Sequence, residues 1–322
     1  MRFPSLQVAT GRVAWRQGQY DQALTAFESA AESGQAEAVS CVARALASLG
    51  HVDHAIERLR PFATRNPECA FLFVMFSLES RTLDHNRQRF EDLLLRWPQL
   101  AYAALAIHAI DSLAGSPAPP PRGGARIQAI IESAEWLVRH GGGRVFGTAA
   151  RLLNFALDAC PKRGQVLEFG VYHGRSIKQI AQRTQRPVHG FDSFQGLPED
   201  WKPGEGAGAY STDGRLPSVP ENVSLHRGWF VDSVAPFLRD TGQKVAFAHI
   251  DCDLYSSTRT VLDAIDNYLV PGSVLLFDDL LGYPGHADHE LRALREWSAT
   301  SGLRWHVLGH VLLGREVAVQ LS

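Results

Sequence analysis

The pattern of apolar and polar positions changes near the middle of the chain. Residues 5 to 113 place apolar residues at the three-to-four-residue spacing of amphipathic helices. From Gly164 onward, short apolar runs typical of buried strands alternate with helical runs, as in a parallel sheet covered on both faces. The expected strands are Val166–Phe169, Val188–Phe191, Val223–Arg227, Val245–Ile250 and Ser273–Phe277, and the expected helices are Ser176–Arg183, Ser233–Asp240, Thr258–Tyr268 and His289–Ser301.

Two further apolar runs end the chain, Leu303–Val307 and Glu316–Leu321, and the stretch between them contains Gly309 and Gly314. Two short strands with a glycine-containing connection favour an antiparallel hairpin. The pattern therefore predicts an α/β fold, a doubly wound sheet with an antiparallel last strand, preceded by an all-α domain.

The helical part contains a weak repeat with an offset of 32 residues. Small residues let two helices approach closely, while larger ones fill the groove between them. The pattern resembles degenerate tetratricopeptide repeats, which present a concave face to a protein partner, although these helices could equally pack on the second domain or pair two subunits into a homo-oligomer. A third unit could run from Phe71 to Pro98, and His51, His54 and His108 are expected on solvated helix surfaces. The repeated positions are Gly18, Tyr20, Ala23, Phe27 and Ala30, followed by Gly50, Val52, Ala55, Leu59 and Phe62.

A stretch rich in proline and glycine, AGSPAPPPRGGA, separates the two parts of the chain. It cannot hold a helix, because proline removes backbone donors and glycine adds chain entropy. Helices expected at Ile127–Arg139 and from Gly147 to Ala159 precede the first strand and could cover the mouth of the second domain. The predicted organisation is a helical domain over 1–113, a linker over 114–125 and an α/β domain over 126–322, of which 126–160 forms the N-terminal helices or lid.

Charge and composition exclude several functions. The formal net charge is −2 and no run of Lys or Arg occurs, so we expect no binding of nucleic acid or of an anionic membrane. No segment reaches the roughly 18 apolar residues of a membrane span, and the first residues lack a targeting pattern, which predicts a cytoplasmic protein. The 4 cysteines are widely spaced, which argues against a disulfide framework and a zinc site, and Cys252 has no base at a spacing that favours a nucleophile.

The loop after the first expected strand reads EFGVYHGRS and begins at Glu168. Gly170 and Gly174 would let the backbone turn tightly and approach a ligand, and Ser176 could cap the following helix. The middle glycine of a dinucleotide fingerprint is missing, and the nearby Glu168 would repel a pyrophosphate but attract a cation. Asp192 ends the second strand, where an acid usually binds ribose hydroxyls. These features favour a nucleoside with a positive charge and no phosphate, such as S-adenosylmethionine.

Two acidic motifs follow later strands, HIDCDLYSST at 249–258 and LLFDDL at 275–280. Because the carboxyl ends of parallel strands meet at one edge of a sheet, Asp251, Asp278 and Asp279 could hold a hard cation beside a reacting hydroxyl. Oxygen-only ligation favours magnesium, calcium or manganese over zinc. In the alternative interpretation, the pair of aspartates only caps the next helix or turn.

Five motifs in order, EFGVYHGRS, FDSFQGLPED, RGWFVDS, HIDCDLYSST and FDD, together resemble the macrocin O-methyltransferase family over about residues 125 to 322. The resemblance implies a class I, Rossmann-like methyltransferase fold, S-adenosylmethionine and Mg2+ as cofactors, and methyl transfer to a hydroxyl of a glycoside, nucleotide sugar or glycan intermediate. It makes Asp251, Asp278 and Asp279 the metal ligands. Trp229 would line the adenosine, or alternatively lie in the core. The expected cofactor-binding residues are Glu168, Phe169, Gly170, Tyr172, Gly174, Ser176, Asp192, Ser193, Gly228, Trp229 and Asp251.

Methyl transfer needs an aligned oxygen nucleophile that loses its proton. Asp251 is the first candidate for the catalytic base, followed by Asp253 and His249. His286 and His289 could serve if their loop folds over the site.

The acceptor has no recognisable code in this sequence. Catechol O-methyltransferases carry a lysine where this chain has Leu254, which argues against a catechol mechanism. Alternatives to the sugar enzyme are an O-methyltransferase of a vicinal-diol or phenolic small molecule, and a non-catalytic tetratricopeptide adaptor with a degenerate methyltransferase domain. The segment from Lys202 to Arg215 is expected to be a mobile lid or a disordered loop.

Overall fold

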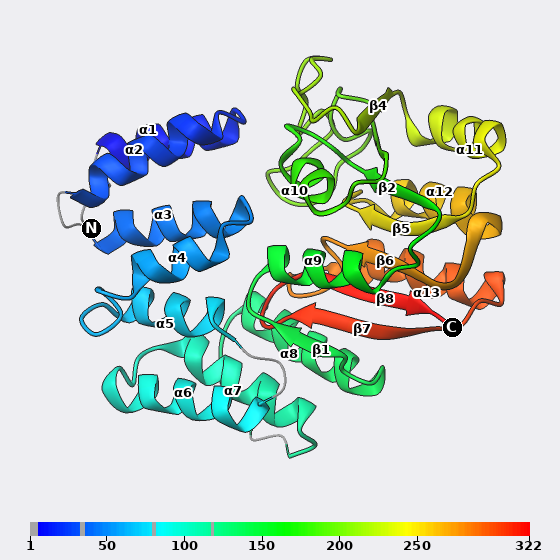
Figure 1. The fold of residues 1–322 in the computed structure, drawn as a ribbon. Coiled ribbons are helices and arrows are strands. Elements are labelled where there is room, and N and C mark those ends of the chain that lie inside the picture. Colours follow the sequence, from blue (N-terminus) through cyan, green and yellow to red (C-terminus); the bar gives the residue numbers. More distant parts are fainter. Residues whose placement is uncertain (1–5, 33–35, 79–81, 117–118) are drawn as a thin grey trace. The chain divides into compact units, whose positions relative to one another are not determined.

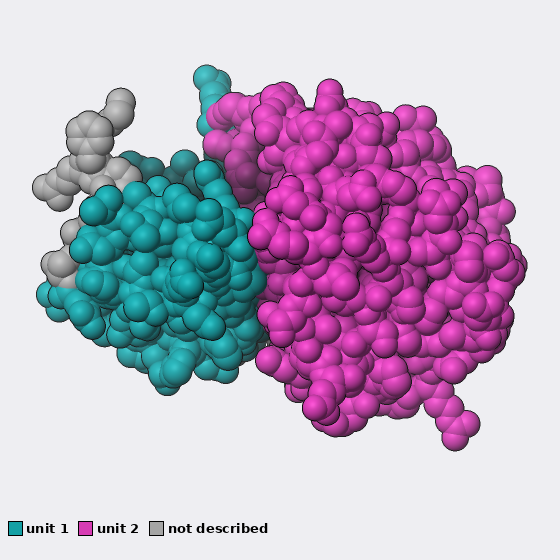
Figure 2. All heavy atoms as spheres, turned by 90° about the horizontal axis from the view of Figure 1, so that it is seen from above, with its two compact units in different colours: residues 1–122, 145–151 teal, residues 123–144, 152–322 magenta. Residues whose placement is uncertain are grey.

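A computed structural model describes residues 6–32, 36–78, 82–116 and 119–322 (Figure 1). The chain divides into two compact units, coloured in Figure 2. The first comprises residues 1–122 and 145–151, and the second comprises residues 123–144 and 152–322. The short segment 145–151 belongs to the first unit because its backbone packs closely on helix α5, where a Cβ atom on Gly147 would lie 1.6 Å from the carbonyl oxygen of Met75. Composition alone does not reveal such a packing contact.

The first unit is built from helices, as the sequence predicts for residues up to 113. Successive helices pack on one another, α1 on α2, α2 on α3 and α3 on α4. No helix in the described part of either unit has the length and apolar character needed to cross a membrane. The helices are α1 (Leu6–Arg16), α2 (Tyr20–Glu32), α3 (Ala36–Ser48), α4 (Val52–Leu59), α5 (Pro67–Phe76), α6 (Leu83–Arg96) and α7 (Ala101–Leu113).

The repeated sequence positions occupy equivalent places in two helix pairs. Gly18 and Gly50 adopt φ values of +72° and +91° in the turns before α2 and α4, and such positive values favour glycine. Ala23 and Ala55 are both fully buried one turn further on. The tetratricopeptide assignment stays a prediction, and residues 79–81 of its third unit and 117–118 of the linker lie outside the described residues. The expectation that His108 is solvated is wrong, because α7 buries most of its length and leaves this side chain 7% exposed.

Three elements connect the helices of the first unit to the main sheet, α8 (Ala125–Arg139), β1 (Arg144–Phe146) and α9 (Ala149–Ala159). The two helices agree in place with the sequence prediction. Strand β1 was not expected, because three residues are too few to produce a periodic pattern.

The sheet has eight strands in the order β1-β7-β8-β6-β5-β2-β3-β4. Strands β4, β3, β2, β5 and β6 pair in parallel, whereas β8 is antiparallel to both β6 and β7. This doubly wound sheet with a reversed last strand has the class I methyltransferase topology, so the predicted fold class is confirmed. The strands are β2 (Gln165–Phe169), β3 (Val188–Asp192), β4 (Val223–Arg227), β5 (Val245–Ile250), β6 (Leu269–Phe277), β7 (Trp305–Val311) and β8 (Val317–Leu321).

The helices between these strands lie where the alternating pattern predicts them, with ends that differ by up to three residues. One detail is wrong: Gly309 lies within β7, opposite Ala318, and does not belong to the turn of the terminal hairpin. The helices are α10 (Arg175–Arg183), α11 (Phe230–Thr241), α12 (Tyr255–Ile265) and α13 (Glu290–Ser301), with short 3-10 turns η1 (Asp266–Tyr268) and η2 (His286–Asp288). Because β2, β3, β5 and β6 run in one direction, the loops after them gather at the same edge of the sheet (Figure 1).

Candidate active site

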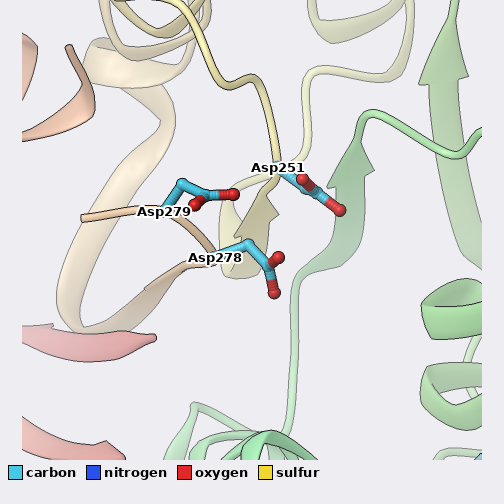
Figure 3. Close-up of side chains that lie close together, drawn as sticks. All are labelled: Asp251, Asp278 and Asp279. Atoms are coloured by element: carbon cyan, nitrogen blue, oxygen red, sulfur yellow. The ribbon is translucent and has the colours of Figure 1, made fainter. Parts of the chain in front are cut away.

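Three aspartates meet at the carboxyl edge of the sheet. Asp251 follows β5 directly, and Asp278 and Asp279 follow β6. One oxygen from each carboxylate lies within 4.8 Å of the others, and Figure 3 shows the three side chains gathered at this edge. The backbone explains this convergence, because the Asp251 amide donates to the carbonyl of Phe169 and the Asp278 amide donates to that of Ile250, both at 2.9 Å. The parallel ladder thus continues one residue beyond each strand and brings both loops to the same level.

The donor set suits a hard divalent cation. It offers carboxylate oxygens from three residues and no sulfur, which is the ligand chemistry of magnesium, calcium or manganese. The pair does not cap the next helical segments, since Gly285 and His289 occupy those cap positions. The predicted metal ligands therefore lie together, with a chemistry that fits the predicted ion.

Charge crowding is the main electrostatic feature of the aspartate cluster. Burial, reinforced by the charge of Asp278, raises the pKa of Asp251 well above its usual value. Burial also raises the pKa of Asp279 to about 6, against the opposing effect of Arg315. For Asp278 burial acts in the same direction, but contact with His249 outweighs it and lowers the pKa. A bound cation would relieve the repulsion among these carboxylates.

His249 lies between two acids and not at an open surface. Its Nδ1 is 2.8 Å from Oε1 of the fully buried Glu168, and its Nε2 is 3.7 Å from Oδ1 of Asp278. Burial opposes the charged imidazole, but the two carboxylates together raise the pKa of His249 well above its usual value. Both ring nitrogens thus face acids within the protein, which suits a supporting role better than proton transfer from a substrate.

The glycine loop after β2 lies against the aspartate cluster. Gly170 has φ +91°, and a Cβ atom there would lie 1.9 Å from the carbonyl oxygen of Asp251. Gly174, with φ +77°, is the N-cap of α10. The expectation that Ser176 caps this helix is therefore wrong, because α10 already begins at Arg175.

Asp192 holds this loop in place. Its Oδ2 accepts hydrogen bonds from the amides of Val171 and Tyr172 at 2.8 Å each, and its Oδ1 accepts from the amide of Phe194 at 2.6 Å. Each carboxylate oxygen has two lone pairs, so these bonds leave one lone pair, on Oδ1, for a ribose hydroxyl of the kind predicted for Asp192. The sequence did not indicate its contacts to the loop.

The other predicted cofactor residues lie around this loop in different environments. Phe169 is fully buried and stacks on Phe191, so its side chain belongs to the core. Ser193 is buried, and its hydroxyl accepts from the amide of Gln195 at 3.1 Å. The amide of Gly228 donates to the carbonyl of Asp192 at 2.9 Å. Trp229 is 36% exposed, so the alternative that it lies in the core is wrong.

The segment 202–215 is folded, and the expectation of a disordered loop is wrong. The amides of Gly208 and Leu197 bond to the carbonyls of Leu197 and Ala209 at 2.9 and 2.8 Å, respectively. At its start, the buried Trp201 packs with Leu254 from the loop after β5 and with Tyr283 from the loop after β6.

Two side chains of this segment reach the neighbouring loops. The Nζ of Lys202 lies 3.3 Å from the Trp201 ring centroid and 5.7 Å from that of Tyr283 in the loop after β6, and it pairs with Glu205 at 3.2 Å. The Tyr210 ring packs edge-on against Tyr172 of the glycine loop at 5.6 Å. The segment therefore borders the glycine loop and the loops after β5 and β6.

The remaining candidate bases differ in their surroundings. Asp253 adopts φ +59°, and burial, reinforced by Asp279 and Asp278, raises its pKa well above the usual value. His286 is buried with Nδ1 2.8 Å from the carbonyl oxygen of Tyr283. His289 lies beside the rings of Trp201 and Tyr283.

The Cys252 thiol is a poor nucleophile in this environment. It is 4% exposed, and burial raises its pKa well above the usual value, so the thiolate is disfavoured.

Two residues of the site were missed by the sequence analysis. Glu290, the first residue of α13, is fully buried and accepts from the amides of Cys252 and Asp279 at 3.2 and 3.1 Å. Arg315 reaches from the turn between β7 and β8 and donates to Oδ1 of Asp279 at 2.5 Å. The only local signal was that acids are common in the first turn of a helix, which does not distinguish Glu290 from other such residues.

Comparison with known proteins agrees with this topology. Residues 167–280 match the family model described as a methyltransferase domain. The fold is thus that of the class I methyltransferases, and the protein is a methyltransferase. No curated protein matches the chain.

Among solved structures, the chain is similar to the calicheamicin methyltransferase CalS11, with 23% identity, a TM-score of 0.42 and coverage of 69% of this chain and 93% of that one. It is also similar to the O-methyltransferase NovP, with 20% identity, a TM-score of 0.40 and coverage of 53% and 78%. A third similar structure is an O-methyltransferase from Bacillus cereus in complex with SAH, with 12% identity, a TM-score of 0.37 and coverage of 69% and 99%.

Proposed function

We propose that the protein is an S-adenosylmethionine-dependent and Mg2+-dependent O-methyltransferase that acts on a sugar hydroxyl. The observation that carries this proposal is the convergence of Asp251, Asp278 and Asp279 beside the glycine loop of a methyltransferase domain. Methyl transfer to an alcohol needs an activated oxygen next to the methyl donor, and the close approach of Gly170 to the carbonyl of Asp251 supports such a pairing of cofactor and metal.

The chain's own residues would divide the work as follows. The loop from Glu168 to Ser176, held by Asp192, would bind the nucleoside and methionine parts of the cofactor. Asp251, Asp278 and Asp279 would hold the metal, and Asp251 or Asp253 would accept the proton of the acceptor hydroxyl. Mg2+, when bound, would orient two adjacent hydroxyls and lower the pKa of one, while S-adenosylmethionine would supply the methyl group.

A sugar acceptor is supported by the five motifs shared with the macrocin O-methyltransferases. Vicinal-diol and phenolic small molecules are the alternative acceptors. Incubation with labelled cofactor and Mg2+, with nucleotide sugars, glycosides and catechols offered in parallel, distinguishes them by the product that carries the label.

The metal requirement is tested with Asp279→Ala. We expect its turnover to fall at least about a hundredfold and its Mn2+ binding to be lost, because one of three ligands is removed. Asp263→Ala is the matched control, since this exposed aspartate on α12 pairs only with Arg259 in the described structure. Full activity of Asp279→Ala in the presence of a chelator would refute the metal-dependent mechanism.

For the N-terminal helices we propose a degenerate tetratricopeptide array that binds a protein partner. The equivalent turns at Gly18 and Gly50 and the equivalent buried Ala23 and Ala55 support this interpretation. Pairing of two subunits is the alternative, and sedimentation of the full chain at increasing concentration distinguishes a dimer from a monomer that awaits a partner.

A further inference from the structure

Glu290 accepts hydrogen bonds from both loops that carry the proposed metal ligands, the loop after β5 and the loop after β6. The first residue beyond each strand, Asp251 after β5 and Asp278 after β6, donates its amide to the neighbouring strand. The second residue of each loop, Cys252 and Asp279, has no further strand carbonyl to meet. Both of these amides donate instead to the carboxylate of Glu290, at 3.2 and 3.1 Å.

The geometry points to Glu290 as the positioning residue of the metal site. A single rigid carboxylate, with one oxygen for each loop, replaces the hydrogen bonds that the strands no longer supply. It thereby sets the separation between the Asp251 loop and the Asp278–Asp279 loop, and with it the distances among the three ligand carboxylates. This assignment rests on the proposed metal dependence and deepens it.

Burial makes the two hydrogen bonds to Glu290 difficult to replace. Glu290 is completely buried, as are Asp279 and Cys252 to within 5% exposure, so water does not compensate for a lost bond. The side chain comes from α13, whose buried Leu291, Leu294 and Trp297 anchor that helix in the core. The position of the carboxylate is therefore fixed from outside the two loops.

Glu290→Gln is the sharpest change, because it preserves volume but replaces one acceptor oxygen with an NH2 group that faces an amide donor. One of the two loops then loses its bond, so the ligand carboxylates lose their fixed spacing. Supporting groups behind metal ligands typically contribute tenfold to a hundredfold in affinity. We expect at least a tenfold weaker Mn2+ affinity, measured by calorimetry on the full chain, with S-adenosylmethionine affinity within about twofold of the unchanged protein.

Glu296→Gln is the matched control, with the same chemical change on the same helix at an exposed site that bonds Tyr255 and Arg292. It should leave Mn2+ affinity unchanged. A second readout is turnover: with an identified acceptor, excess Mg2+ should restore the activity of Glu290→Gln, which a change that only loosens the fold would not allow. If Glu290→Gln does not fold, Glu290→Asp, which retains both oxygens on a shorter side chain, takes its place in the same titrations.

The outcomes separate this inference from the function on which it rests. Absence of Mn2+ binding by the unchanged protein would overturn both. Binding by the unchanged protein with equal affinity in Glu290→Gln would overturn the role of Glu290 alone. A parallel loss of metal and cofactor affinity would also overturn it, because the effect would then be general loosening.

Discussion

At the scale of single residues, Gly170 lies where two backbone segments touch. A methyl group on this residue would meet the carbonyl of Asp251, which no side-chain rotation can move, and φ +91° adds strain. Gly204→Ala is a matched control, because that glycine has φ +89° and no atom lies within 4 Å of the place where its methyl group would be. In urea unfolding we expect a loss of about 1 kcal/mol for Gly204→Ala and at least about 3 kcal/mol for Gly170→Ala. Equal losses would contradict the close approach.

The position of each residue relative to the strands explains which site residues could be predicted from the sequence. Asp251, Asp278 and Asp279 directly follow strand-like runs, so strand direction alone predicts that they lie at one edge. Glu290 and Arg315 reach that edge from a helix and from a hairpin turn distant in sequence. Their contacts depend on how the helix and the hairpin pack, which no local pattern encodes.

At the scale of elements, the segment 197–215, which contains the predicted loop 202–215, is held near its start by Trp201. This side chain is 7% exposed and packs with Leu254 and Tyr283, whereas Trp229 is 36% exposed. We expect Trp201→Ala to speed amide hydrogen exchange across the segment 197–215 at least about tenfold, because the buried contacts that hold it are lost. Exchange in the β5 and β6 strands should change little.

Trp229→Ala, which removes the same side chain from a half-exposed site, should leave exchange in the segment 197–215 unaltered. Unchanged exchange in Trp201→Ala would mean that the backbone hydrogen bonds of the segment, among them those of Leu197, hold it without the Trp201 side chain.

Strands and helices were predictable where the pattern was long or fully apolar. Strand β5 is buried at every position, and its predicted ends are correct. Strand β6 begins four residues earlier than expected, since Pro271 and Gly272 interrupt the apolar run, and a register shift accommodates them. Glycine and proline are ambiguous signals, because they mark both turns and strand irregularities.

At the scale of the whole molecule, the doubly wound sheet with its antiparallel last strand was the decisive agreement between pattern and structure. Alternation of strands and helices permits only a few topologies, because parallel crossovers are almost always right-handed. The grouping of residues 145–151 with the helical unit was not predictable, since it depends on tertiary contacts such as the close approach at Gly147 and the ion pair of Arg151 with Asp53.

Stability of the α/β unit should depend on pH through His310. This histidine of β7 is 2% exposed, and burial lowers its pKa to about 4. The unfolded chain, with an ordinary histidine pKa of about 6.5, binds the proton more readily, so this contribution to stability is lost as pH falls from about 6.5 to 4.

His310→Leu cannot bind that proton, so its stability relative to the unchanged protein should rise toward acid by at most about 1.4 kcal/mol per pH unit. Urea unfolding of both proteins at several pH values measures this difference in stability. Burial raises the pKa of Glu316 to about 7, which contributes to stability in the opposite direction. Glu316 is present in both proteins, so its contribution cancels in the difference. A stability difference that stays constant between pH 7 and 4.5 would contradict the assignment.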